Sequence, residues 1–279
     1  MATQQSFFQV VSETIRYYQE HGFQSAEQLQ MWVEKIRRAA VESLVPESVL
    51  NEELNRTLGG IYKRLIDDGQ ILKAHQGVGR FTVDRLKPKL RSELDRRLMV
   101  SRNLIKLNRQ QMVEKTTQRF AGWASSIPAG GSRAVEVKDV KDNIRKALTS
   151  LPFEERRCAI DQGHKFTAAL NEIIAVDGGA IAMRWHSKFR QPGYQFRRDH
   201  KERDGNIYLL RSSWAKEKGL VKPGPAGYYD DITKVGEEVY CGCWATWLYA
   251  IRDLPEDMLT VAGKKAIEDA RAKIAAMRT

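Results

Sequence analysis

Apolar residues recur at helical spacing from the start of the chain, which predicts a helical N-terminal region. The first predicted helix covers about residues 4–20 and stops at the His-Gly pair of residues 21–22. A second helix starts with a capping box over residues 25–28 and ends before Pro46. A third helix runs from residue 46 or 47 to about residue 68, where an Asp-Gly pair closes it.

The next predicted element is a long amphipathic helix that begins near Pro88 and carries many cations. Between Arg80 and Arg119 the sequence has twelve Lys or Arg residues against four acidic residues. The apolar residues among them keep mostly helical spacing, so the cations cover the opposite face. Such a face is either only solvated or binds DNA phosphates without reading sequence. The candidate phosphate contacts are Arg91, Arg96, Arg97, Arg102, Lys106 and Arg109.

A run rich in Ser, Pro and Gly over residues 125–132 is the clearest break in the helical pattern. It divides the chain into a helical domain (1–125), a linker (126–133), an α+β domain (134–253) and a C-terminal helix (254–279) that starts at Pro255. The expected fold class is therefore a mainly α N-terminal domain followed by an α+β C-terminal domain with a small β-sheet.

The predicted α+β domain begins with two helices, over residues 137–151 and 152–176. A short strand over residues 206–210 is expected to pair with a longer strand over residues 238–249. The longer stretch is rich in β-branched and aromatic residues, which favour extended structure.

The longer predicted strand contains Cys241 and Cys243, two of the three cysteines of the chain. Residues two apart in a strand share a face, so both thiols are expected to point the same way. Strand geometry does not suit a disulfide between them, so the thiols are free to bind metal. The alternative is that both are small buried hydrophobic residues.

Two histidines precede these cysteines by about forty residues or more. His200 and Asp204 are four apart and lie on one face if the segment between them is helical. Two sulfur ligands with one or two imidazoles form a typical zinc site, with His186 as the natural fourth ligand. Alternatively, His200 is an ordinary histidine in a polar core and His186 is a surface residue beside a packed tryptophan.

Composition indicates a folded, basic protein. Hydrophobic residues make up 42% of the 279 residues, and the net charge of +11 with a pI near 9.5 points to an acidic partner such as nucleic acid. A generic lysine-rich surface gives the same charge. Three cysteines argue against a disulfide framework, and neither a signal peptide nor a membrane span is expected. The chain is therefore expected to fold in the cytoplasm.

Several motifs in the second half of the chain occur in a characteristic order. They are Trp185-His186, Arg197-Arg198-x-His200-x-x-x-Asp204-Gly205, the Pro-Gly loop of residues 222–227, and Cys241-Gly242-Cys243. Together they resemble the minor head or head-morphogenesis proteins of tailed bacteriophages, the Mu-type minor head family. The resemblance covers about residues 140–250, and its motif residues include Trp185, Arg198, Asp204 and Gly205.

This resemblance implies a low-copy structural protein of the virion head, made in the host cytoplasm and multimeric in the particle. Its implied partners are the portal, other head proteins and packaged double-stranded DNA. A metal-dependent, HNH-like nuclease is the alternative, because a histidine beside acidic residues and a metal can activate water. A third possibility is a nucleic-acid-binding regulator or non-specific DNA-binding protein. The expectation is a protein that is not an enzyme.

Overall fold

The computed structural model describes residues 6–132 and 137–277, and it contains two compact units that are interleaved in sequence. Unit 1 comprises Met1–Leu54 and Met99–Ala159, and unit 2 comprises Asn55–Leu98 and Ile160–Thr279. Each unit draws residues from both sides of the predicted linker, of which residue 133 lies outside the described residues. The predicted domain limits therefore stay a prediction.

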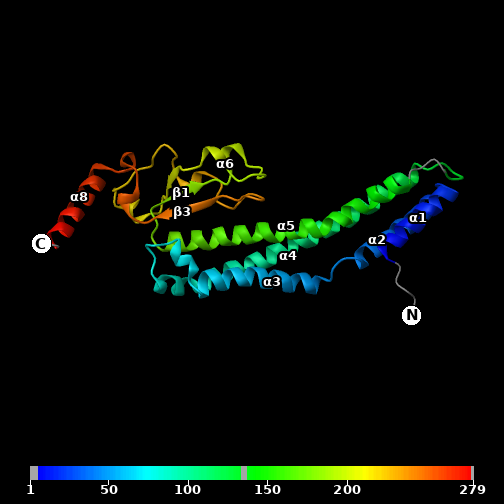
Figure 1. Ribbon diagram of the computed structural model, residues 1–279, viewed down its shortest axis with the longest axis horizontal. Helices are drawn as coiled ribbons and strands as arrows, with labels where there is room; N and C mark the ends of the chain where they lie inside the picture. The colour runs from blue at the N-terminus through cyan, green and yellow to red at the C-terminus, as the bar shows by residue number, and fades with distance from the viewer. Residues whose placement is uncertain (1–5, 133–136, 278–279) are drawn as a thin grey trace. The chain divides into compact units, whose positions relative to one another are not determined.

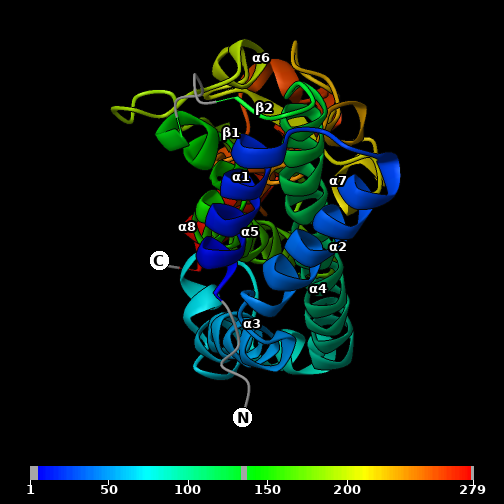
Figure 2. The same cartoon turned by 90° about the vertical axis from the view of Figure 1, so that its right-hand side faces the viewer.

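Unit 1 is helical, and its first two helices start where the sequence places their caps. The Ser6 side chain accepts a hydrogen bond from the Gln9 backbone N–H in a capping box at the start of α1 (Phe7–His21). The Ser25 side chain accepts from the Gln28 N–H at the start of α2 (Ala26–Glu42). Figure 2 shows these two helices side by side. The predicted first helix begins at residue 4, and residues 4–5 lie outside the described residues.

The core of unit 1 joins α1 and α2 to parts of two long helices, α4 (Arg80–Ser125) and α5 (Val137–Asp177). Tyr18 packs its ring edge against Phe120 at a centroid distance of 5.6 Å. Each large apolar side chain that is fully buried in this way contributes about 1.5–3 kcal/mol. The apolar helix faces predicted from helical spacing are therefore the surfaces that pack together in the core of unit 1.

The long helices of unit 2 are α3 (Glu47–Tyr62) from Asn55 onward and the remaining parts of α4 and α5 (Figure 1). The end of α3 widens into a π-helical turn, Lys63–Asp67, before Gly69 stops it in a left-handed conformation with φ 72°. A short 3-10 helix, Gln70–Lys73, follows. The shared core includes Leu58, Leu90, Phe166 and Leu170, all fully buried.

Two helix boundaries that were predicted at prolines are wrong. α4 begins at Arg80 and contains Pro88, and α5 is one helix through Pro152 where two were predicted. A proline inside a helix costs about 3 kcal/mol because it removes one hydrogen bond and crowds the preceding turn. Burial of Leu86 and Leu90 beside Pro88, and of Leu151 beside Pro152, offsets that cost.

The sheet of unit 2 has three antiparallel strands in the order β2-β1-β3. The strands are β1 (Ala182–His186), β2 (Ile207–Leu209) and β3 (Trp244–Leu248). Met183 of β1 lies opposite Tyr208 on one side and Trp247 on the other. The predicted direct pairing of the two later strands is therefore wrong, because β1 lies between them. The predicted fold class, a mainly helical region with a small sheet in the C-terminal part, is confirmed.

Short helices lie between the strands of unit 2 and after the last strand. They are α6 (Arg198–Glu202), α7 (Trp214–Glu217) and the 3-10 turns Tyr229–Asp231, Ile251–Asp253 and Glu256–Met258. The last helix, α8 (Val261–Ala276), begins six residues later than Pro255, because the Thr260 side chain caps it by accepting from Gly263 N–H. Among the described residues, no helix is both long and apolar enough to cross a membrane.

Candidate metal centre

Three potential metal ligands meet in the interior of unit 2. His200 lies on α6, and Cys241 and Cys243 lie in the loop that leads into β3. These residues are 2%, 3% and 8% exposed. The Nδ1 atom of His200 lies 3.7 Å from the Cys241 Sγ and 3.5 Å from the Cys243 Sγ. Histidine and both thiols therefore converge on one buried point.

The spacing of these atoms matches tetrahedral coordination. Metal–ligand bonds of about 2.3 Å to sulfur and about 2.0 Å to nitrogen place an S and an N ligand about 3.5 Å apart across a tetrahedral angle. The two observed N···S distances, 3.5 and 3.7 Å, are close to that value. The His200–Cys241–Cys243 group can therefore hold a metal ion with little movement.

The other ring nitrogen of His200 faces carboxylates. Nε2 lies 3.5 Å from a Glu238 carboxylate oxygen and 3.9 Å from an Asp199 oxygen. Metal-binding histidines commonly donate their second N–H to a carboxylate, which fixes the ring and makes the ligand more basic. Trp185, fully buried on β1, packs edge-on against the His200 ring at 5.3 Å and holds it from the side.

The pKa values of the two thiols are shifted in opposite directions. A hydrogen bond from the Cys243 thiol is the main cause that lowers the pKa of Cys241 to about 5, and backbone N–H groups and His200 add to it against the effect of burial. The pKa of Cys243 is raised, because its thiol donates that hydrogen bond and is itself buried. The surroundings of Cys241 therefore favour its thiolate, which is the form of cysteine that binds metal.

The cysteine loop is shaped by contacts that do not involve its sulfur atoms. Tyr240 has a left-handed backbone, φ 58°, and its N–H donates to the buried Asp161 carboxylate at 2.6 Å. The Tyr194 hydroxyl donates to the Tyr240 carbonyl and accepts from the Gly242 N–H. This left-handed residue is the reason why the predicted strand over residues 238–249 is wrong in its first half: β3 begins only at Trp244.

Two residues predicted for the site lie elsewhere. His186 ends β1, donates or accepts at the Thr246 hydroxyl at 2.9 Å and stacks on Trp244 at 5.0 Å. Asp204 follows α6, and its carboxylate accepts from the Ser187 N–H at 2.8 Å. Neither belongs to the His200–Cys241–Cys243 group found among the described residues, so the predicted role of His186 as fourth ligand needs correction.

The remaining motif residues organise the turn between α6 and β2. Gly205 adopts φ 82°, and its N–H donates to the Trp185 carbonyl at 2.8 Å, which ties the turn to β1. Asp204 fixes the backbone just after β1 in the same place. Arg198 points to solvent and pairs only with Glu202 on its own helix among the contacts described. Trp185, Asp204 and Gly205 therefore position α6, whereas Arg198 does not.

The predicted DNA contacts fall into different environments. Arg91, Arg102 and Lys106 are exposed on α4. Arg96 is half-exposed and pairs with Glu93, and Arg97 is mostly covered and pairs with the same carboxylate. Arg109 is buried, where its guanidinium binds Glu155. Arg109 therefore cannot contact a DNA phosphate in this conformation, because its charge is enclosed.

A second buried histidine, His75, is not predicted from the sequence as a functional residue. His75 Nε2 donates to the Asn171 side-chain oxygen at 2.9 Å, and its Nδ1 accepts from the Tyr249 hydroxyl at 2.5 Å. Burial lowers the pKa of His75 below its ordinary 6.5. Nothing in the spacing of these residues signals the contact, since Tyr249 is 174 positions from His75.

Comparison with known proteins identifies no similar protein: no family model, no curated protein and no solved structure matches this chain.

Proposed function

We propose that this chain is a structural minor head protein of a tailed bacteriophage whose His200–Cys241–Cys243 group binds one zinc ion. The observation that carries the zinc is the convergence of two buried thiols and an imidazole at tetrahedral spacing. The ligands come from segments 41 and 43 residues apart, so an ion would tie α6 to the loop before β3. Such a link stabilises a small domain whose sheet has only three strands.

The donor set favours zinc over other common ions. Thiolate and imidazole are soft or borderline ligands, which select zinc or similar transition metals and disfavour magnesium and calcium. The Glu238 carboxylate lies 3.5 Å from His200 Nε2 without a hydrogen bond, and a small movement would make it the outer partner that metal-binding imidazoles usually have. Binding requires deprotonated thiols and a neutral imidazole, so affinity should fall as the solution becomes acidic.

The role in the phage head rests on the motif order and on charge. A chain with net charge +11 suits a partner that carries negative charge, such as packaged DNA. Arg91, Arg96 and Arg102 are accessible for contacts with the phosphate backbone. Portal and other head proteins are the remaining proposed partners. A reconstruction of the particle that carries the protein tests this role: density for it inside the head, near the portal, is expected, and its absence from the particle would contradict it.

Metal content tests the zinc centre. Protein purified without chelator should contain close to one zinc per chain by elemental analysis, and Cys241→Ser should lower zinc content and the stability of unit 2 together. Cys158→Ser is the matched control, because it removes the third thiol, which lies outside the group. Equal zinc content in Cys241→Ser and Cys158→Ser, or zinc-free protein of native stability, would rule out the centre.

One observation favours a second candidate, a metal-dependent nuclease. The described group supplies three protein ligands, and three-ligand zinc sites often hold a reactive water in the fourth position. A cavity of about 350 Å³ borders Cys243 and is also lined by His164 and Lys188. Incubation of the protein with plasmid and magnesium, manganese or zinc separates the two functions: cleavage that disappears in His200→Ala would replace the structural role by a catalytic one.

A further inference from the structure

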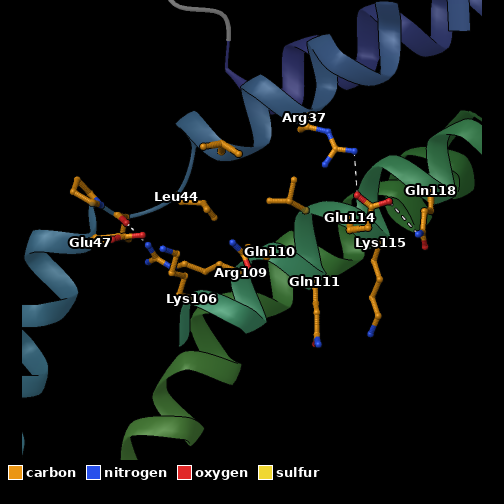
Figure 3. Close-up of a pocket in the computed structure, with 14 residues that line it drawn as sticks. Arg37, Leu44, Glu47, Lys106, Arg109, Gln110, Gln111, Glu114, Lys115 and Gln118 are labelled. Atoms are coloured by element: carbon orange, nitrogen blue, oxygen red, sulfur yellow. Dashed lines mark hydrogen bonds and ion pairs between the residues drawn. The ribbon is translucent and has the colours of Figure 1, made fainter. Parts of the chain in front are cut away.

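Unit 1 contains an open groove between the end of α2 and the face of α4 from Lys106 to Gln118, with a volume of about 860 Å³ (Figure 3). We name it the α2/α4 groove. Its apolar walls are formed by Val41, Leu44, Val45, Pro46 and Val113. Val41 and Val45 are 53% and 46% exposed, so apolar surface is open to solvent here. Exposed apolar surface that lines a groove marks an interaction site more often than isolated surface residues do.

Arg109 lines this groove and carries a buried donor without an acceptor. Its Nε donates to the Glu155 carboxylate at 2.5 Å, and its Nη1 donates to the Val45 carbonyl at 2.7 Å. Its Nη2 is buried and has no hydrogen-bond partner among the described residues. Because this guanidinium is enclosed and paired with Glu155, the charge that an occupant of the groove meets comes from the exposed lysines Lys106 and Lys115.

The charged residues around the groove have a positive excess. The cations that line it are Arg37, Lys106, Arg109 and Lys115, and the acids are Glu47 and Glu114. Arg37 is neutralised by Glu114 at 3.0 Å, and Figure 3 shows this pair closing the gap between α2 and α4. Lys106 remains exposed beside Arg109. An occupant with carboxylates near Lys106 and Lys115 would therefore complement the groove in charge.

We propose that the α2/α4 groove binds an acidic amphipathic helix of another protein. The α4 face from Lys106 to Gln118 is about 18 Å long, which accommodates about 12 residues of helix. Apolar residues on one face of such a helix would fill the space along Val41 and Val45, and flanking carboxylates would lie near the exposed Lys106 and Lys115. This inference goes beyond the proposed function and does not depend on the metal.

Two other occupants fit less well. DNA carries its charge on phosphates, which gain nothing from the apolar walls of the groove, and the Arg109 guanidinium is buried. A second copy of this chain carries the same net charge of +11, so association of two copies through this basic groove is opposed by repulsion. An acidic amphipathic helix matches both the apolar walls and the charge of the groove.

The proposal is tested with a designed probe and the full-length chain. The probe is a fluorescent helical peptide of about 14 residues with leucines along one face and glutamates elsewhere, and its partner probe carries lysines in place of the glutamates. Fluorescence anisotropy should show binding of the acidic probe and at least about tenfold weaker binding of the basic one. Val41→Asp and Val45→Asp should each weaken the acidic probe about tenfold, because both place a carboxylate in the apolar wall.

Matched variants outside the groove provide the controls. Val49→Asp on α3 and Leu107→Asp on α4 change similarly exposed apolar residues that do not line the groove, and they should leave affinity unchanged. Lys106→Glu should weaken the acidic probe more than Arg85→Glu, which makes the same change in net charge elsewhere on α4. The proposal would be overturned if the acidic probe did not bind, or if both probes bound equally well. It would also be overturned if duplex DNA displaced the acidic probe equally well from the parent and from Val41→Asp. So would self-association in light scattering that Val41→Asp abolishes, because a second copy would then occupy the groove.

Discussion

The ion pair between Arg109 and Glu155 is the most enclosed one of unit 1 among the described residues, which makes its removal informative. The two side chains are 7% and 10% exposed, and Glu155 is the only carboxylate that pairs with Arg109 in the described part of the chain. Glu155→Leu would leave a buried guanidinium that is held by the Val45 carbonyl alone. Breaking a buried pair from one side typically costs about 3–5 kcal/mol. We expect about 3 kcal/mol, the lower end, since Arg109 borders the groove and can turn toward water.

Urea unfolding followed by circular dichroism measures this cost. The double variant Arg109→Met/Glu155→Leu should recover most of the lost stability, to within about 1 kcal/mol of the parent, because no unpaired charge remains. Asp95→Asn is the control: it breaks the exposed Arg91–Asp95 pair on the same helix, and such pairs contribute about 0–1 kcal/mol. If Glu155→Leu costs no more than Asp95→Asn, or if the double variant is less stable than the single one, the role of burial at this pair is refuted.

Two further predictions concern charge. If the exposed cations of α4 contact DNA, affinity should fall with salt, and Arg91→Glu or Arg102→Glu should each reduce the log–log slope by about 0.9, measured by filter binding; an unchanged slope would indicate a face that is only solvated. Because burial lowers the pKa of His75, the folded state takes up a proton less readily than the unfolded state. The stability that neutral His75 contributes is therefore present above about pH 6.5 and lost as the pH falls below it, and the urea midpoint should drop less between about pH 8 and about pH 5 in His75→Gln than in the parent.

Helical spacing predicted the helices of this chain well but not where they end. The stripes that contain Val11, Ile36 and Leu90 are buried as expected, since a face that repeats every 3.6 residues can be buried only against another element. The helix boundaries predicted at Pro88 and Pro152 are wrong, because the rule that proline ends a helix does not include the packing of the residues around it. The free energy gained by burying the neighbouring leucines outweighs the loss of one backbone hydrogen bond. A helix propensity assigned to a single residue does not include this burial.

The residue types correctly predict that His200, Cys241 and Cys243 lie together, but the strand predicted to carry the two cysteines is wrong. His200, Cys241 and Cys243 meet, but the two thiols converge from a loop and not from one face of a strand. The left-handed Tyr240 sets that loop, and its partner Asp161 is 79 positions away. Contacts over such separations leave no pattern in a single sequence. Because long-range contacts leave no such pattern, the sequence predicts His186 at the site and gives no sign that His75 is buried and hydrogen-bonded.

The hydrogen bonds of the cysteine loop bear on what a bound ion contributes. Asp161 holds the Tyr240 N–H, Tyr194 holds the backbone on both sides of Cys241, and Arg197 donates to the Val239 carbonyl at 2.9 Å. None of these contacts uses a sulfur atom, so the backbone of the cysteine loop is held by protein groups other than the proposed metal ligands. An ion that binds the folded chain more tightly than the unfolded chain raises the free energy of unfolding by the difference between the two binding free energies. Zinc would therefore add to a network of hydrogen bonds that also holds the loop, whereas small zinc fingers depend on the ion for their fold.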